Sequence, residues 1–301
     1  MNRSLLDAKG SAAIPMTPFT EDDKIDIPIL EKEIEFLVEC KVGCICTPLM
    51  VSEFQSLSVE ERKLMIRVPI EVNDGNRIMI ANATAVDTRT AIEYAVYSEK
   101  LGADAVNIMP PYVGNLDKNG MIRYYGEIAN AISIPVMIQN HAQAPLTSPE
   151  VVDLCTKYKN ISWVKQEVAP GPDSIADLAT VRTDAIEGIM SGFGGIYSPL
   201  DFALGATATI HACQICDLVQ YEWDLLFEGK DDEARDFHAK ILPLLQLEIM
   251  FGWVLSKEVM VRRGIFRNTI VRNKGAGLPR FALEELDKVW RRIEPMLLWK
   301  K

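Results

Sequence analysis

The sequence has 301 residues, 48% of them hydrophobic and 25% charged, which fits one large globular domain or two ordinary ones. A formal net charge of −10 argues against nucleic acid or an anionic membrane as the main partner. No apolar run has the length of a transmembrane helix, and the N-terminal segment lacks the apolar core of a signal peptide. Together with six cysteines, which fit reduced thiols, this predicts a cytoplasmic protein.

Short apolar runs alternate with amphipathic helical segments over roughly the first 230 residues. The runs predict eight strands, at 12–16, 43–47, 77–81, 105–109, 135–139, 161–165, 185–190 and 206–211. The segments between them predict helices at 29–38, 58–72, 87–101, 120–131, from 148 onward, 173–180 and 197–204.

Start and stop signals accompany several of these helices. Ser58 and Glu61 have the spacing of a capping box, and Asp87 is a candidate N-cap. Ser148, followed by a proline and a glutamate, predicts another helix start at residue 148. Prolines and a glycine at 170–172 predict a loop after the sixth strand.

Regular alternation of strand and helix predicts a parallel sheet. Eight such units in this length favour a closed (β/α)₈ barrel over an open doubly wound sheet. After residue 230 the pattern becomes helical, with predicted helices at 231–253, 257–264 and 282–298. We therefore expect a barrel over residues 1–230 and, over residues 231–301, a C-terminal helical extension packed on it.

The carboxyl ends of the strands are where a barrel of this kind carries its chemistry. Lys165, at the end of the sixth strand, is the one lysine found at a predicted strand end. A desolvated amine loses part of its proton affinity, and a neutral amine can attack a carbonyl carbon. The other interpretation of Lys165 is a side chain that enters solvent where the strand stops.

Two further motifs leave alternatives open. The glycine-rich turn that starts at Ser191 and Gly192 offers backbone N–H groups for a carboxylate or phosphate, or is simply a tight turn. His211, Cys213 and Cys216 have the residue types of a metal or redox site, but small buried side chains are the more frequent explanation.

Several segments resemble the dihydrodipicolinate synthase / N-acetylneuraminate lyase superfamily of lysine-dependent aldolases and dehydratases. The resemblance runs from the segment 15–19 to the helical tail, and includes the segments 52–62 and 109–112. Lys165 falls at the place of the family's Schiff-base lysine, and the resemblance implies that it is the nucleophile. It also implies a homodimer or homotetramer and a small 2-keto acid as substrate.

Departures from the family's usual pattern narrow the expected function. Gln139 stands where the family has its proton-shuttle tyrosine, and segment 143–145 lacks the arginine of dihydrodipicolinate synthases, which argues against lysine biosynthesis. Phe193 and Gly194 replace the polar residues of sialic-acid lyases. The L-2-keto-3-deoxyarabonate dehydratases resemble this chain in their strand-five glutamine and in a glutamate two residues after the lysine.

The resemblance implies that Lys165 forms a Schiff base with the C2 ketone of a 2-keto-3-deoxy sugar acid. Gln139 orients a hydroxyl, and Tyr112 donates a hydrogen bond or lines the pocket. The remaining candidates are substrate-binding residues at the strand ends: Ser52, Glu53, His141, Glu167, Ser191, Gly192 and His211. A structural role is the alternative for Glu53, and Glu167 either tunes Lys165 or bonds to backbone. Both histidines are expected to titrate near neutrality or to be satisfied residues of the rim. No metal or organic cofactor is implied, because the protein amine is the electron sink.

Three other functions remain open. An aldolase would cleave a keto-deoxy acid and release pyruvate. A deaminase would act on a hydroxypyrroline carboxylate and release ammonia. A non-catalytic barrel would bind sugar acids as a sensor and form no covalent adduct at Lys165.

Overall fold

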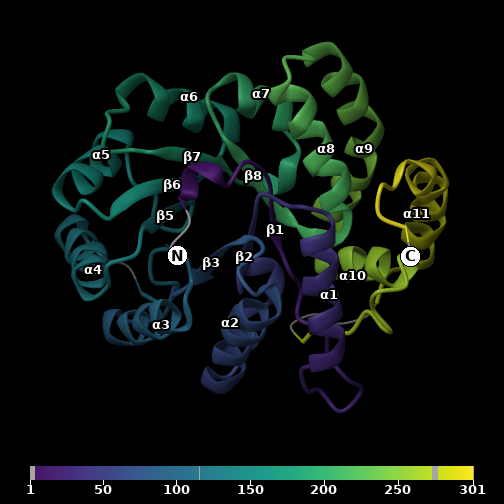
Figure 1. The fold of residues 1–301 in the computed structure, drawn as a ribbon, viewed down its shortest axis with the longest axis horizontal. Helices are drawn as coiled ribbons and strands as arrows, with labels where there is room; N and C mark the ends of the chain where they lie inside the picture. Colours follow the sequence, from purple (N-terminus) through teal and green to yellow (C-terminus); the bar gives the residue numbers. More distant parts are fainter. Residues whose placement is uncertain (1–3, 115, 273–276, 301) are drawn as a thin grey trace.

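The computed structural model describes residues 4–114, 116–272 and 277–300, and its strands form one closed ring. All neighbouring strands are parallel, and the ring closes by pairing of β8 with β1 (Figure 1). The strands are β1 Gly10–Ile14, β2 Cys44–Thr47, β3 Ile78–Asn82, β4 Ala105–Ile108, β5 Val136–His141, β6 Ile161–Glu167, β7 Gly188–Ser191 and β8 Ala208–Ala212. The predicted (β/α)₈ barrel with a C-terminal helical extension is confirmed.

Helices surround the ring, one after each strand (Figure 1). They are α1 Ile27–Glu39, α2 Val59–Asn73, α3 Thr88–Leu101, α4 Lys118–Ala131, α5 Ser148–Lys157, α6 Gly171–Val181, α7 Ser198–Ala203 and α8 Cys216–Phe227. The extension contains α9 Asp231–Phe251, α10 Trp253–Arg262 and α11 Arg280–Ile293.

Alternation along each strand decides which side chains enter the barrel. In β6, Trp163 belongs to the buried cluster inside the ring, whereas its neighbour Val164 packs in the cluster beneath the helices. Successive strand residues point to opposite faces, so Lys165 points inward with Trp163. Gly188 of β7 makes room for the Trp163 indole, because a Cβ at position 188 would lie 2.1 Å from that ring.

Local sequence signals fix several helix starts. Ser58 and Glu61 form the predicted capping box at α2, with Glu61 Oε2 accepting from the Ser58 N–H at 2.9 Å. Asp87 caps α3 as predicted, accepting from the Thr90 N–H at 3.0 Å. At α5 the cap is Thr147 and not Ser148, because Glu150 reaches back to the Thr147 N–H.

The segment 170–172 differs from the predicted loop. Helix α6 begins at Gly171, with Pro170 as its N-cap residue and Pro172 in the first turn. The N–H groups of the first helical turn have no partner inside the helix, so a proline there removes nothing that the helix needs. The chain therefore turns directly from β6 into α6.

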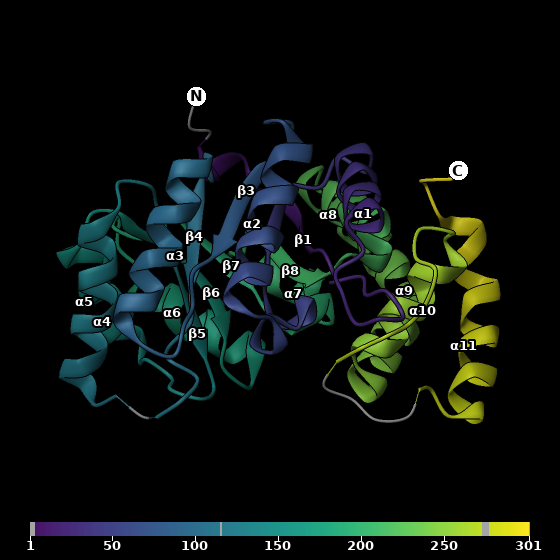
Figure 2. The same ribbon diagram turned by 90° about the horizontal axis from the view of Figure 1, so that it is seen from below.

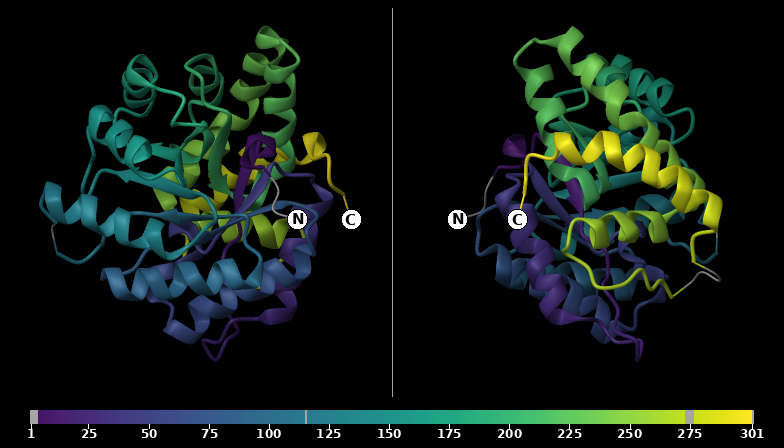
Figure 3. Two further views of the ribbon diagram at one scale, coloured as in Figure 1. Left: turned by 60° about the vertical axis from the view of Figure 1, so that its left-hand side comes forward. Right: turned by 90° about the vertical axis from the view of Figure 1, so that its right-hand side faces the viewer.

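Helix α9 packs against α8, helices α10 and α11 pack against α9, and α11 is the outermost of them (Figures 2 and 3). Leu225 of α8, Leu244 of α9, Val259 of α10 and Leu286 of α11 belong to one buried apolar cluster. This shared core supports our proposal that residues 231–301 form an extension of the barrel and not a separate domain.

The extension's helices end and begin at residues that break regular structure. The predicted helix 231–253 stops at Phe251, because Gly252 has a φ of 67°. The predicted helix 282–298 stops at Ile293 and continues as a short 3₁₀ turn containing Pro295, whose ring cannot continue an α-helix. In the described part of the chain, none of the helices combines the length and apolar character needed to cross a membrane.

Candidate active site

A cavity of about 370 Å³ opens at the carboxyl ends of the strands. Its walls come from β1, the turn after β2, β6, the turn after β7, β8, and helices α9 and α10. The lining residues are Ile14, Met50, Val51, Lys165, Glu167, Phe193, Gly194, Ile196, Ile210, His211, Ala212, Leu245, Glu248, Ile249, Gly252 and Trp253. Most are apolar, so the few ionisable side chains define what the cavity can do.

Lys165 and Glu167 form the polar centre of this cavity. Lys165 is 2% exposed, and its Nζ lies 2.9 Å from Glu167 Oε2. Gln139 Nε2 donates to the same carboxylate oxygen at 2.7 Å. Burial opposes ionisation of Glu167, but the Lys165 ammonium and this amide outweigh burial and hold the pKa of the Glu167 carboxyl below its usual value. Lys165 and Glu167 therefore form an ion pair inside the cavity.

A chain of amides inside the barrel fixes the orientation of Gln139. Gln139 Oε1 accepts from Asn107 Nδ2 at 2.8 Å, which leaves the Gln139 NH₂ group directed at Glu167. The same Asn107 group lies 3.4 Å from Asn82 Oδ1, which also accepts from the Thr84 hydroxyl at 2.7 Å. Both ends of the Gln139 amide are thus occupied by protein groups.

His141 ends β5 on the same inward face as Gln139. Its Nδ1 accepts from the Gln143 N–H at 3.2 Å. Burial lowers the pKa of His141, with Glu167 acting in the opposite direction and Lys165 in the same direction. The imidazole is therefore neutral at pH 7 and lies in the electrostatic field of the lysine–glutamate pair.

Gly192 follows β7 and lies directly against Glu167. A Cβ at position 192 would lie 2.7 Å from Glu167 Cγ, so glycine is what allows the glutamate to reach Lys165. The Gly192 N–H donates to the Gln166 carbonyl at 3.0 Å. The Gly192 N–H is one of the groups predicted to bind an anion, and it is already hydrogen-bonded to protein.

Ser52 and Glu53 lie near the mouth but are held by other protein groups. The Ser52 hydroxyl donates to the Pro15 carbonyl at 2.5 Å, which joins the turn after β2 to the end of β1. Glu53 is 2% exposed and pairs with Lys257 of α10 at 2.8 Å. Its second oxygen accepts from the Arg272 backbone N–H at 2.8 Å.

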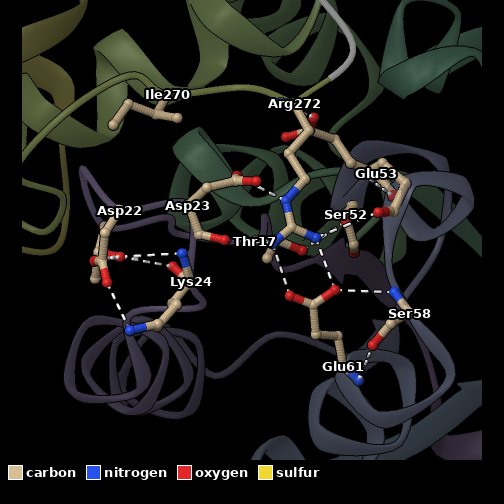
Figure 4. Close-up of polar contacts among 12 residues, drawn as sticks. Thr17, Asp22, Asp23, Lys24, Ser52, Glu53, Ser58, Glu61, Ile270 and Arg272 are labelled. Carbon is tan, nitrogen blue, oxygen red and sulfur yellow. Dashed lines mark hydrogen bonds and ion pairs between the residues drawn. The ribbon is translucent and has the colours of Figure 1, made fainter.

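The Arg272 side chain extends the same contact between the extension and the barrel. Its guanidinium donates to both oxygens of Glu61 at 2.7 Å and to Asp23 at 2.8 Å (Figure 4). Hydrogen bonds therefore hold segment 268–272 against the loops that follow β1 and β2. A substrate-binding role for Ser52 and Glu53 stays a prediction.

Tyr112 and Ser191 also lie outside the lining of the cavity. The Tyr112 ring packs edge-on against Phe54, with 5.5 Å between ring centroids. Ser191 is 1% exposed and follows Met190, which belongs to the cluster inside the ring, so Ser191 faces the helices. The roles predicted for both residues remain untested.

His211 contributes to the cavity wall, but its ring is engaged elsewhere. Nδ1 lies 2.7 Å from the Ala212 carbonyl oxygen and Nε2 lies 2.8 Å from Ser11 Oγ. A carbonyl only accepts, so Nδ1 carries the proton and Nε2 accepts from the serine. Burial lowers the pKa of His211 to about 4, so of the two alternatives given for this histidine, the satisfied residue of the rim fits the structure.

The cysteines of the CxxC pair have separate partners. Cys213 Sγ donates to Glu33 Oε1 at 3.0 Å. Cys216 lies with Cys40 and Asp217 in a group of potential ligand atoms within 4.8 Å of one another. Asp217, however, already accepts two hydrogen bonds from Arg263, at 2.8 and 2.9 Å. His211, Cys213 and Cys216 are thus not brought together as one ligand set.

Sequence reasoning missed Asn107 and Glu248 as residues of the site. Asn107 lies on β4 two residues after the inward-facing Ala105, so alternation was a signal that could have found it. Glu248 comes from α9 and carries no such signal, because its position depends on how the extension docks.

The structure defines a class of protein: a (β/α)₈ barrel with a buried lysine on β6 inside a cavity at the carboxyl ends of the strands. The sequence model of the Dihydrodipicolinate synthetase family matches residues 7–286. The chain belongs to this family, and the predicted membership is confirmed. Members of the family are lyases, and Schiff-base chemistry is typical of them.

Relatives with assigned names are of two kinds. The 4-hydroxy-tetrahydrodipicolinate synthase of Methanocaldococcus jannaschii is 31% identical over 245 residues, which cover 79% of this chain and 82% of that protein. The L-2-keto-3-deoxyarabonate dehydratase of Azospirillum brasilense is 23% identical over 296 residues, which cover 96% of both chains. The names agree on the family and differ on the substrate.

Solved structures agree on the fold. Dihydrodipicolinate synthase from Rhodopseudomonas palustris superposes with a TM-score of 0.89 at 23% identity, covering 97% of this chain and all of that one. A prophage protein of the dihydrodipicolinic acid synthase family from E. coli K12, in complex with pyruvate, superposes with a TM-score of 0.87 at 21% identity. The match covers 95% of this chain and 98% of that one.

Proposed function

We propose that the protein is a Schiff-base-forming lyase that dehydrates a 2-keto-3-deoxy sugar acid, of the L-2-keto-3-deoxyarabonate kind, to a 2-oxo acid semialdehyde. One observation carries the proposal: the buried Lys165 amine shares the Glu167 carboxylate with the amide of Gln139. The Lys165 amine has Glu167 as its acid–base partner. Position 139 on β5 carries a glutamine and not the tyrosine that is usual in the family. The dehydratase among the relatives gives the proposal its substrate class.

In the proposed first step, Lys165 transfers a proton to Glu167 when the substrate displaces water from the cavity. The neutral amine attacks the C2 ketone and forms a carbinolamine. Glu167 returns its proton to the carbinolamine hydroxyl, which leaves as water and produces the iminium. The 2.9 Å contact makes one carboxyl sufficient for both transfers.

In the second step, the iminium acidifies the C3 proton and the Glu167 carboxylate removes it. The resulting enamine expels the C4 hydroxyl, which takes up a proton and leaves as water. A proton shift from C5 and hydrolysis of the iminium then release the semialdehyde and free Lys165. Retro-aldol cleavage would instead require a base to deprotonate the C4 hydroxyl. Gln139 cannot act as that base, because an amide does not exchange protons near neutral pH. The site therefore favours elimination over cleavage of the carbon–carbon bond.

The substrate carboxylate would be held by the turn after β2. Met50 and Val51 line the cavity and are the first residues of the 3₁₀ turn Met50–Ser52. First-turn N–H groups have no partner within a helix, so they are available to an anion. This contact would admit a small anionic acid although the formal net charge of the chain is −10.

Product analysis tests the proposal. The purified protein is incubated with a panel of 2-keto-3-deoxy acids, and the products are identified by mass spectrometry. We expect a semialdehyde. Pyruvate plus an aldehyde would identify an aldolase instead, and ammonia from a hydroxypyrroline carboxylate would identify a deaminase.

Borohydride trapping tests the nucleophile independently. We expect substrate plus borohydride to add a reduced adduct to the peptide that contains Lys165, and Lys165→Arg to abolish both the adduct and turnover. Lys288→Arg, on the exposed face of α11, is the matched control. A wild-type protein that binds the acids without an adduct would be a sensor.

Assembly and location remain predictions. The family supports a homo-oligomer, either a dimer or a tetramer, and light scattering during size-exclusion chromatography would distinguish them. A cytoplasmic location would be tested by fractionating cells that express the tagged chain.

A further inference from the structure

The cavity contains one carboxyl that the proposed mechanism has not used. Among the described residues that line it, the side chains able to exchange a proton are Lys165, Glu167, His211 and Glu248. The first two form the imine and remove the C3 proton. Elimination of water also needs a proton donor for the leaving hydroxyl, since hydroxide is a poor leaving group.

His211 does not fit the role of this donor. Both ring nitrogens have protein partners, and burial lowers the pKa of His211 to about 4. A neutral imidazole whose one N–H is bonded to the Ala212 carbonyl has no proton to give to a substrate. This leaves Glu248.

The helical geometry of α9 places Glu248 in the cavity wall. Leu245, Glu248, Ile249 and Gly252 all line the cavity, and their spacing of three, four and seven residues from Leu245 is that of a single helix face. Leu245 and Ile249 flank Glu248 with apolar surface. Glu248 is therefore the carboxyl that the extension contributes to the cavity.

The surroundings of Glu248 favour its protonated form. Burial raises the pKa of Glu248 to about 7, against the opposing hydrogen bond from Gln214 Nε2 to its Oε2. The residue also lies in the last turn of α9, where the negative end of the helix dipole disfavours a carboxylate. A carboxyl of this kind holds a proton near neutral pH and can still release it.

We propose that Glu248 is the general acid of the elimination, donating its proton to the C4 hydroxyl as that group leaves. This inference rests on the proposed function and adds the second carboxyl to it. The enamine electron pair forms the C3–C4 double bond, the C4–O bond breaks, and oxygen leaves as water with the Glu248 proton. Glu167 keeps the proton from C3, so each carboxyl changes its charge once and in opposite directions.

Glu248→Gln separates this role from the earlier steps. We expect the dehydration rate to fall by on the order of 100-fold or more, the usual contribution of general acid catalysis. Wash-in of deuterium from D₂O at C3, and the borohydride adduct on Lys165, should both persist near wild-type levels. Glu233→Gln, on an exposed position at the start of the same helix, is the matched control.

A substrate analogue with fluorine in place of the C4 hydroxyl gives a second test. Fluoride leaves without protonation, so Glu248→Gln should release fluoride at close to the wild-type rate while it fails to release water.

Dehydration at the wild-type rate by Glu248→Gln would overturn the inference and leave the proposed function intact. Parallel loss of deuterium exchange, fluoride release and dehydration would also overturn it, since Glu248 would then act before the elimination. A wild-type protein that dehydrates none of the acids would overturn the proposed function as well, and this outcome is visible before any variant is made.

Discussion

Glu167 reaches Lys165 only because residue 192, on the neighbouring strand's end, lacks a side chain. The Glu167 side chain contacts Lys165, the Gln139 amide and the backbone of Gly192. A lysine and a glutamate two residues apart on a strand share one face, which the sequence alone already implied. That the two groups approach to 2.9 Å depends also on Gly192.

Gly192→Ala tests this dependence. The new Cβ would lie 2.7 Å from Glu167 Cγ, so the carboxylate must move away from the amine. We expect turnover to fall on the order of 100-fold, as misplacement of a catalytic group by about 1 Å commonly costs, with little change in Tm. Steady-state kinetics and thermal unfolding would measure both. Gly277→Ala is the control, because a Cβ there meets no atom within 4 Å, and equal activity of the two variants would contradict this account.

At the scale of elements, the extension is joined to the mouth of the barrel by a buried ion pair. Lys257 of α10 and Glu53 after β2 have side chains that are 1% and 0% exposed, 2.8 Å apart. Lys257 Nζ also donates to the Ile270 carbonyl at 2.6 Å. Removing one member of such a pair leaves an uncompensated charge in the interior.

Lys257→Met should therefore destabilise the protein by about 3–5 kcal/mol, whereas adding Glu53→Gln to it should restore part of that loss. Urea unfolding measures the free energy of each variant, with Lys288→Met on exposed α11 as the control. If the single and double variants lost the same free energy, the contact would contribute packing and not charge compensation.

Alternation and helix periodicity explain how far the sequence could predict this site. Gln139, His141, Lys165 and Glu167 lie together because each has an inward position near the end of β5 or β6. The partners of His211 could not be predicted, because its neighbour Ile210 faces the inside of the ring and alternation directs the His211 side chain to the other face. Its partner Ser11 lies two hundred residues earlier, on a strand that becomes its neighbour only when the ring closes.

Glu248 shows what the sequence could not reveal. The helix around it was predicted, but which of its faces meets the barrel depends on packing among α8, α9 and α11, which no local pattern encodes. The fold was predictable as a whole because eight strand–helix repeats point to one closed sheet.

At the scale of the whole molecule, carboxyls with raised pKa values set how stability depends on pH. Burial raises the pKa of Glu33 to about 8, and of Asp201 and Glu248 to about 7. In the unfolded chain these groups titrate near pH 4. Between pH 6.5 and 8.5 the folded protein therefore holds more protons than the unfolded chain, and stability must fall as pH rises through this window.

We expect the free energy of unfolding to decrease by roughly 2 to 4 kcal/mol from pH 6.5 to pH 8.5, from the size of these three pKa shifts. Urea titrations at several pH values measure it. Glu33→Gln should flatten the dependence, whereas Glu285→Gln on exposed α11 should keep it. Stability that stays level or increases towards pH 8.5 would contradict the assignment of protonated interior carboxyls.

The closure of the ring between β1 and β8 has a consequence for biosynthesis. Gly10 of β1 pairs with Ala208 of β8. Strand β1 therefore leaves the ribosome long before β8, one of its two neighbours in the ring, has been translated. Until then the nascent sheet has a free edge, the kind of surface on which other chains can add strands. That edge of β1 is covered only when β8 has been translated and pairs with it.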